Sequence, residues 1–106
     1  MSYRWPNKDP DETLDYSVDW SRFLGTGVSI ATVEWFVDDA NGNKTLIEEG
    51  EVVNGIQNIS ATKTPTVATI NLGLGDNNKE YKFHCRVTDT TGSTAERTIK
   101  LRIRNR

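Results

Sequence analysis

The chain has 106 residues, of which 35% are hydrophobic, and a formal net charge of −2. This length fits one domain that can bury a core without disulfides or metal ions. Residues 1–60 hold eleven acids and four bases, whereas residues 61–106 hold four acids and nine bases. A nucleic-acid binder should gather positive charge without so much compensating acid, so we expect no nucleic acid among the partners.

Two further classes are disfavoured by the sequence. No stretch reaches the roughly 18 apolar residues of a membrane helix, and the N-terminus lacks the apolar segment of a secretion signal. We therefore expect no membrane partner and synthesis in a cytoplasm. Cys85 is the single cysteine, so no disulfide can form within the chain, and a lone thiol in a strand pattern is typical of a small buried hydrophobe.

In chain order, residues 1–13 come first, with two of the three prolines and neither a helical nor a strand period. We interpret them as an extended arm. From Leu14 to Trp20, apolar residues alternate with polar ones, which predicts a half-buried strand. The run Ile30–Val37 is rich in β-branched and aromatic residues and predicts another strand, and the Asp-, Asn- and Gly-rich segment 38–43 predicts a hairpin turn.

The remaining strands are expected from Lys44 to Val53, Ile56 to Lys63, Thr66 to Leu72, Glu80 to Thr88, and through a last strand that contains Ile99, Leu101 and Ile103. About seven strands with regular turn signals and no helical period predict an Ig-like antiparallel β-sandwich, which we assign to residues 14–106. The side chains expected inside are Trp20, Trp35, Tyr81, Phe83, Cys85, Val87, Ile99, Leu101 and Ile103.

The candidates for chemistry are weak. His84 and Cys85 are neighbours in a strand and should point to opposite faces, with Cys85 buried and His84 exposed, which argues against a catalytic dyad. Asp15 and Asp19 lie roughly 13 Å apart along their strand, too far for a pair of catalytic carboxylates. A single histidine and a single cysteine do not make a zinc site. We therefore expect no enzyme activity, no metal and no cofactor.

Trp5 is the exception in the arm, because an aromatic side chain in a polar segment is costly unless something covers it. Two interpretations are equally open. Trp5 either anchors the arm on a neighbouring protein or folds back onto its own domain.

Two stretches of the chain carry a family resemblance. The segment from Trp5 to Trp20 contains Lys8-Asp9-Pro10-Asp11-Glu12 and Leu14-Asp15-Tyr16, and it resembles the "KDPDE-x-L-D-Y-x-x-D-W" opening of short tailed-bacteriophage virion proteins, described as tail-fibre adaptor or head-tail accessory proteins. The closing segment from Tyr81 to Gly92, followed by Glu96 to Ile103, resembles their last hairpin.

The resemblance implies a non-catalytic virion structural protein, present in several copies and assembled in the bacterial host cytoplasm. It would join the tail or baseplate to a fibre through its arm and the edge of its sandwich. The alternatives are a capsid decoration protein, or an Ig-like receptor- or carbohydrate-binding module on the virion surface. The residues expected to bind other virion proteins are Trp5, Pro6, Asp9, Pro10, Asp11 and Glu12.

Overall fold

A computed structural model describes residues 3–105 of the chain. The described residues form strands and turns, and the strands are β1 (Tyr3–Arg4), β2 (Leu14–Asp19), β3 (Ile30–Asp38), β4 (Lys44–Leu46), β5 (Val52–Val53), β6 (Ile56–Lys63), β7 (Val67–Leu74), β8 (Glu80–Asp89) and β9 (Thr94–Arg102). No helix in this part of the chain is long and apolar enough to cross a membrane.

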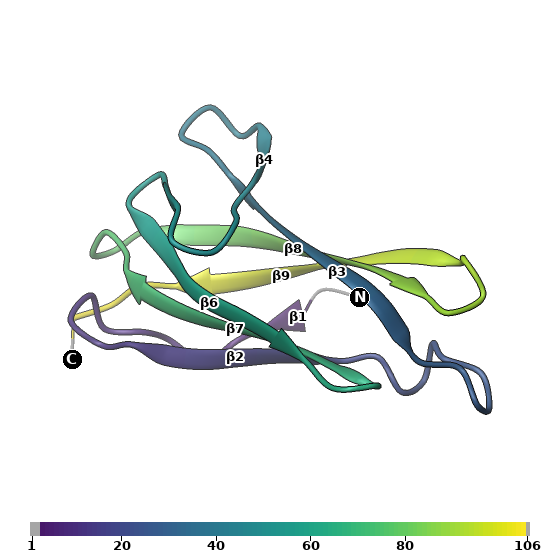
Figure 1. The fold of residues 1–106 in the computed structure, drawn as a ribbon. Coiled ribbons are helices and arrows are strands. Elements are labelled where there is room, and N and C mark those ends of the chain that lie inside the picture. The colour runs from purple at the N-terminus through teal and green to yellow at the C-terminus, as the bar shows by residue number, and fades with distance from the viewer. Residues whose placement is uncertain (1–2, 106) are drawn as a thin grey trace.

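The strands form two sheets packed face to face (Figure 1). One sheet has the order β1-β9-β8-β3-β4, which we call the five-stranded sheet, and the other has the order β2-β7-β6-β5. All neighbours pair antiparallel except β1, which pairs parallel with β9. The order β9-β8-β3 opposite β2-β7-β6 is the arrangement of immunoglobulin-type sandwiches, so the predicted Ig-like fold is confirmed.

The core lies between the two sheets and follows from the alternation of side chains along each strand. In β8, for example, Tyr81, Phe83, Cys85 and Val87 are all buried. Trp35 of β3 lies directly opposite Cys85 of β8, both facing inward. Every side chain that the sequence placed inside is buried, so the predicted core is confirmed.

The number of strands differs from the prediction, because nine are present where about seven were expected. The single strand expected from Lys44 to Val53 is wrong. Its first part, β4, pairs with β3, while its second part, β5, pairs with β6 in the other sheet. The chain crosses between the sheets at Gly50, whose φ of 86° suits glycine.

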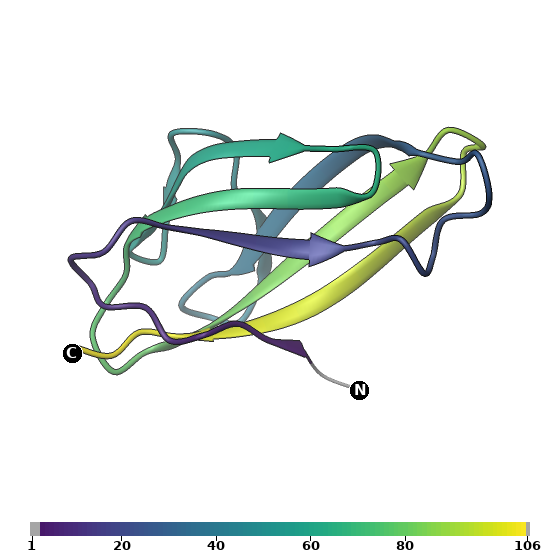
Figure 2. The same ribbon diagram turned by 90° about the horizontal axis from the view of Figure 1, so that it is seen from below.

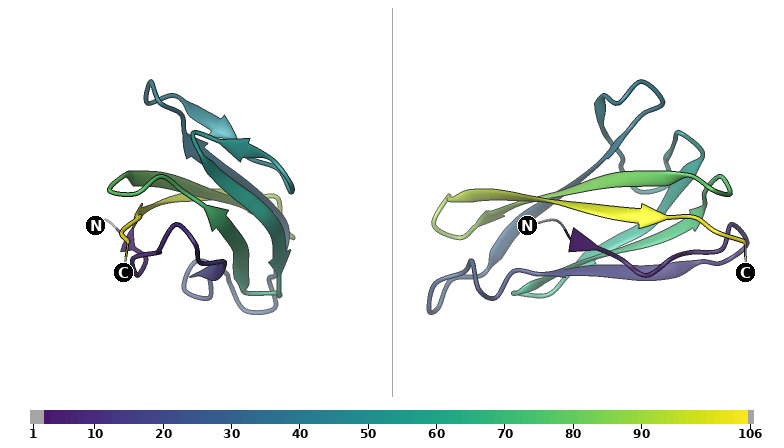
Figure 3. Two further views of the ribbon diagram at one scale, coloured as in Figure 1. Left: turned by 90° about the vertical axis from the view of Figure 1, so that its left-hand side faces the viewer. Right: turned by 180° about the vertical axis from the view of Figure 1, so that it is seen from behind.

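The N-terminal segment begins at the edge of the five-stranded sheet and then crosses to the other sheet (Figure 2). Its β1 runs beside β9, and the chain turns at the end of the molecule where the C-terminus lies before it enters β2 (Figure 3). The segment is extended at β1 and turns at residues 9–12.

Candidate interaction surface

The arm, residues 3–13, is held to the last strand by main-chain hydrogen bonds. The Trp5 amide donates to the Lys100 carbonyl at 2.9 Å, and the Lys8 amide donates to the Arg102 carbonyl at 3.0 Å. The Arg104 amide returns a bond to the Lys8 carbonyl at 2.8 Å. These bonds add the arm to the edge of the five-stranded sheet, so it is part of the folded domain.

Trp5 packs inside its own domain, the second of the two possibilities that the sequence left open. Its side chain is 7% exposed and stacks on Tyr16, with ring centroids 4.9 Å apart. Its ring also approaches Phe83 at 5.6 Å and Trp35 at 5.9 Å. The indole N–H donates to the Ser17 carbonyl at 3.0 Å. The ring joins the two sheets because Tyr16 belongs to one and Phe83 to the other.

Lys8 is a charged residue of the arm that the sequence gave no reason to place in the interior. It has no exposed surface, and its ammonium donates to the carbonyls of Leu74 at 2.6 Å and Asp9 at 2.9 Å. Burial lowers the pKa of Lys8, against the opposing effect of Glu12 and the other nearby carboxylates. The bond to the Leu74 carbonyl ties the arm to the end of β7, whereas the bond to the Asp9 carbonyl lies within the arm.

The acidic turn of the arm is stabilised by its own side chains. The Asp9 carboxylate accepts the Asp11 amide at 2.8 Å, and the Glu12 carboxylate accepts the Asp9 amide at 2.9 Å. Asp9 is therefore buried and Glu12 half-buried, as is Pro10 between them. Of the six residues predicted to bind partners, Pro6 and Asp11 are the two that are exposed.

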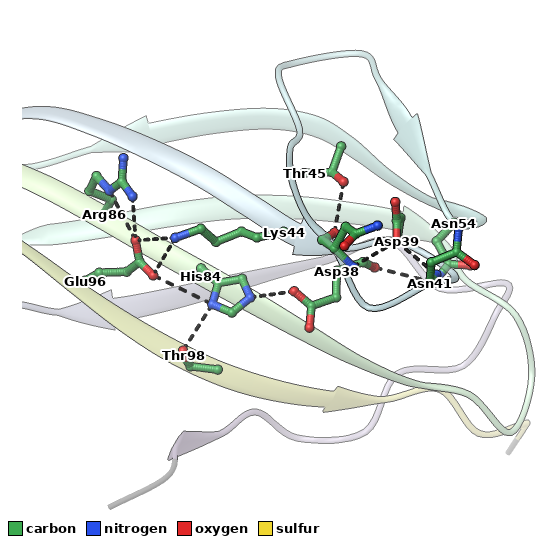
Figure 4. A network of polar contacts seen from close by, with 11 residues as sticks. Asp38, Asp39, Asn41, Lys44, Thr45, Asn54, His84, Arg86, Glu96 and Thr98 are labelled. Atoms are coloured by element: carbon green, nitrogen blue, oxygen red, sulfur yellow. Dashed lines mark hydrogen bonds and ion pairs between the residues drawn. The ribbon is translucent and has the colours of Figure 1, made fainter.

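A second cluster of polar side chains covers the outer face of β8 and β9 (Figure 4). His84 contacts the Asp38 carboxylate through Nε2 at 2.7 Å and the Thr98 hydroxyl through Nδ1 at 3.1 Å. Glu96 accepts bonds from Lys44 and Arg86, each at 3.1 Å. These contacts leave His84 half-buried, so the prediction that this side chain is exposed is wrong.

The Glu96 pKa is lowered by its bonds to Lys44 and Arg86, which outweigh the opposing effect of burial. Cys85 points the other way, into the core, and burial raises the pKa of its thiol to about 12. His84 and Cys85 thus occupy opposite faces of β8, as predicted. Within residues 3–105, no three His, Cys, Asp or Glu side chains gather as they would around a metal ion.

The fold and its polar faces define a small immunoglobulin-type sandwich with an N-terminal segment built into one edge. Residues 8–102 match the family model of the podophage GP4 fiber-tail adaptor protein gp77. Because this match spans most of the chain, the chain belongs to that family, and the resemblance to phage tail-fibre adaptors is confirmed at family level. No curated protein matches the chain.

Proposed function

We propose that this protein is a structural component of a podophage virion that joins the tail to a fibre and works by binding other virion proteins. The observation that carries the proposal is the match of residues 8–102 to a family of fibre-tail adaptors. Assembly in several copies within the host cytoplasm, without nucleic acid or membrane partners, forms part of the same proposal. The family description favours a tail position over capsid decoration or glycan binding.

The arm supplies one contact surface in this proposal, through the side that faces away from the sandwich. Two of the six predicted residues, Pro6 and Asp11, are exposed on that surface. The other four are buried or half-buried beneath it, namely Trp5, Asp9, Pro10 and Glu12. Arg4 at its start is bonded to Glu80 at 2.9 Å. A rigid exposed surface loses less conformational entropy on docking than a free arm would.

Removing residues 2–12 is not a clean test of this surface. It would delete Trp5 from the core and Lys8 from its carbonyl bonds, so the remaining domain is expected to be destabilised.

Substitution of the exposed residues tests the surface directly. Phage that lack this gene would be complemented with Pro6→Glu and Asp11→Lys variants, and fibre content per particle measured by quantitative mass spectrometry and electron microscopy. The matched control is Thr26→Lys, which places a charge in the exposed loop between β2 and β3. We expect the arm variants to fold normally and to lose most of the fibre, and the control to keep it. Full fibre content in both arm variants would refute the arm surface, and normal fibres without this protein would refute the adaptor function.

A further inference from the structure

The opposite edge of the five-stranded sheet is only partly covered by β4. Pairing between β3 and β4 spans Phe36 to Asp38, and the last bond of this ladder runs from the Ile47 amide to the Trp35 carbonyl at 3.0 Å. The chain then leaves β3 and crosses to the other sheet, where the Gly50 amide donates to the Asn58 carbonyl. Within the described residues, the first half of β3 therefore has β8 on one side and no strand on the other.

The main-chain groups at this open edge can be assigned from the register. Residues two apart in a strand direct their N–H and C=O groups to the same side, and β3 pairs regularly with β8 from Thr32 to Val37. Because the Trp35 carbonyl faces the β4 side, the N–H and C=O of Val33 face that side too. The Val33 side chain packs against the core, so the groups of Val33 at this edge are its main-chain N–H and C=O.

The facing edge of β6, in the other sheet, and the main chain at the start of β3 both have charged side chains bonded to them, whereas Val33 has none. The Glu49 carboxylate accepts the Ala61 amide at 3.0 Å, in the place where another strand would bond. The Lys63 ammonium reaches across to the Ile30 carbonyl at 3.4 Å. Charged side chains at sheet edges commonly prevent unwanted pairing, so the unguarded position at Val33 stands out between these two.

A groove lies between the two edges. One part, about 320 Å³ in volume, is lined by residues that include Trp35, Glu34, Glu48 and Glu49. A second part of about 210 Å³ shares Val33, Trp35 and Ala61 with it. The groove is lined by the apolar side chains of Val33, Trp35 and Ala61, and its three carboxylates outnumber the single Lys63. One of the carboxylates, Glu34, lies 3.9 Å from the Arg86 guanidinium.

Two buried polar atoms of groove residues have no hydrogen-bond partner within the described chain. They are Nε1 of Trp35, a donor, and Oδ1 of Asn58, an acceptor. Unpaired buried polar atoms are uncommon in folded proteins and are costly.

We propose that the open edge of β3 at Val33, together with the acidic groove between β3 and β6, is a β-strand addition site for an extended, basic segment of another virion protein. This proposal rests on the adaptor function proposed above and names a site for it. The added strand lies beside β3 and continues the ladder where β4 leaves it. Main-chain bonds to Val33 hold it, an apolar side chain enters over Val33 and Ala61, and a basic side chain meets Glu34 and Glu48.

Val33→Pro is the sharpest probe of this site. Proline lacks the N–H that the added strand needs, while the Val33 amide takes no part in the ladder with β8, so an edge proline is tolerated there. Val33→Thr is the matched control, since it keeps both the branched shape and the N–H. Near-ultraviolet circular dichroism of the buried tryptophans shows whether each variant is folded.

The ligand probe is a set of short overlapping synthetic peptides that tile the tail and fibre proteins of the same particle. We expect the full chain to bind a peptide that alternates basic and apolar residues, with amide shifts at Val33 and Trp35 in nuclear magnetic resonance spectra. Val33→Pro and N-methylation of alternate peptide amides should each weaken binding at least tenfold, while Val33→Thr retains it. Glu34→Lys and Glu48→Lys should each weaken it several-fold at low salt.

The possible failures can be told apart. Equal binding of such a peptide by folded Val33→Pro, or binding that leaves the Val33 amide unshifted, overturns the strand-addition site. The absence of any bound peptide, with the protein present in fibre-bearing particles, also overturns it and leaves the adaptor function standing. If particles assemble with fibres when the protein is missing, the adaptor function itself has failed. Pairing of the edge with a second copy, seen as a dimer lost in Val33→Pro, overturns the identity of the partner.

Discussion

Replacing Trp5 with alanine measures how strongly the arm is built into the domain. The substitution removes a nearly buried indole that contacts the rings of Tyr16, Phe83 and Trp35, and it leaves the Ser17 carbonyl without its donor. Truncation of a buried large aromatic costs about 3–5 kcal/mol, and the lost hydrogen bond adds about 1 kcal/mol.

The expected loss is large compared with the total stability of such a domain. A domain of this size is usually stable by about 5–15 kcal/mol, so a loss of about 4–6 kcal/mol removes roughly a quarter or more of it. At roughly 4–8 °C for each kcal/mol, the thermal midpoint should fall by at least about 15 °C. Thermal and urea unfolding, followed by tryptophan fluorescence and circular dichroism, gives both quantities.

Trp5→Phe is the graded control for this experiment. It keeps a ring against Tyr16 and Phe83 and loses the indole N–H, so we expect a cost of about 1–2 kcal/mol. If Trp5→Ala costs less than about 1 kcal/mol, the indole contributes little to the fold. The arm would then behave as a separable connector, and the reasoning that places Trp5 in the core would be refuted.

Three further outcomes follow from buried or hydrogen-bonded groups. The Cys85 thiol, with its pKa raised to about 12 by burial, should react with Ellman's reagent at mildly alkaline pH only after unfolding. Lys8→Ala should lower the free energy of unfolding in urea by about 2 kcal/mol, because it removes the donor to the Leu74 and Asp9 carbonyls. Lys8→Arg tests whether the same buried position accepts a larger cation. The pKa of Asp89 is lowered, chiefly by the hydrogen bond from the Thr91 hydroxyl, so this carboxylate should stabilise the fold above its unfolded pKa of about 4 and lose that effect as the pH falls through the folded pKa. Unfolding curves of Asp89→Asn should therefore lack this part of the acid dependence, and an unchanged pH profile would contradict the assignment.

Periodicity was sufficient to predict the sandwich and its core. In β8, and from Ile99 to Ile103, the alternation is strict, and a single shift in register would turn the apolar side chains outward, so the sequence alone determines which residues are inside. The turn at 38–43 was equally clear, because Asp39 accepts the amides of Asn41 and Asn43 and Gly42 has a φ of 82°. Each of these features is encoded within a few residues.

Features that depend on distant partners were not predictable in the same way. The prediction of one strand from Lys44 to Val53 fails because the edges of β3 and β6 compete for this segment and divide it between the two sheets. The burial of Lys8 has no sequence signal, since its ammonium is bonded to main-chain carbonyls that any residue carries. The open edge at Val33 depends on where β4 leaves β3, which no local pattern records.

The two proposed contact surfaces lie at opposite edges of one sheet, and this predicts that they act independently. The arm extends the β1 edge, and Val33 lies at the β3–β4 edge, with β9 and β8 between them. Long hydrogen-bonded ladders join these strands, from Glu80 to Thr88 against β9 and across β3 against β8, so the sheet holds the two edges at a fixed separation. Changes at distant sites without shared partners are usually additive. Asp11→Lys should therefore leave peptide binding at Val33 unchanged, and Val33→Pro should leave the contact made by the arm unchanged. In the double variant, the loss of binding free energy at each edge should equal the loss in the corresponding single variant, so that the two losses add. A coupling clearly larger than about 0.5 kcal/mol in this double-mutant cycle would mean that one partner spans both edges, and the sheet would then be a single docking surface.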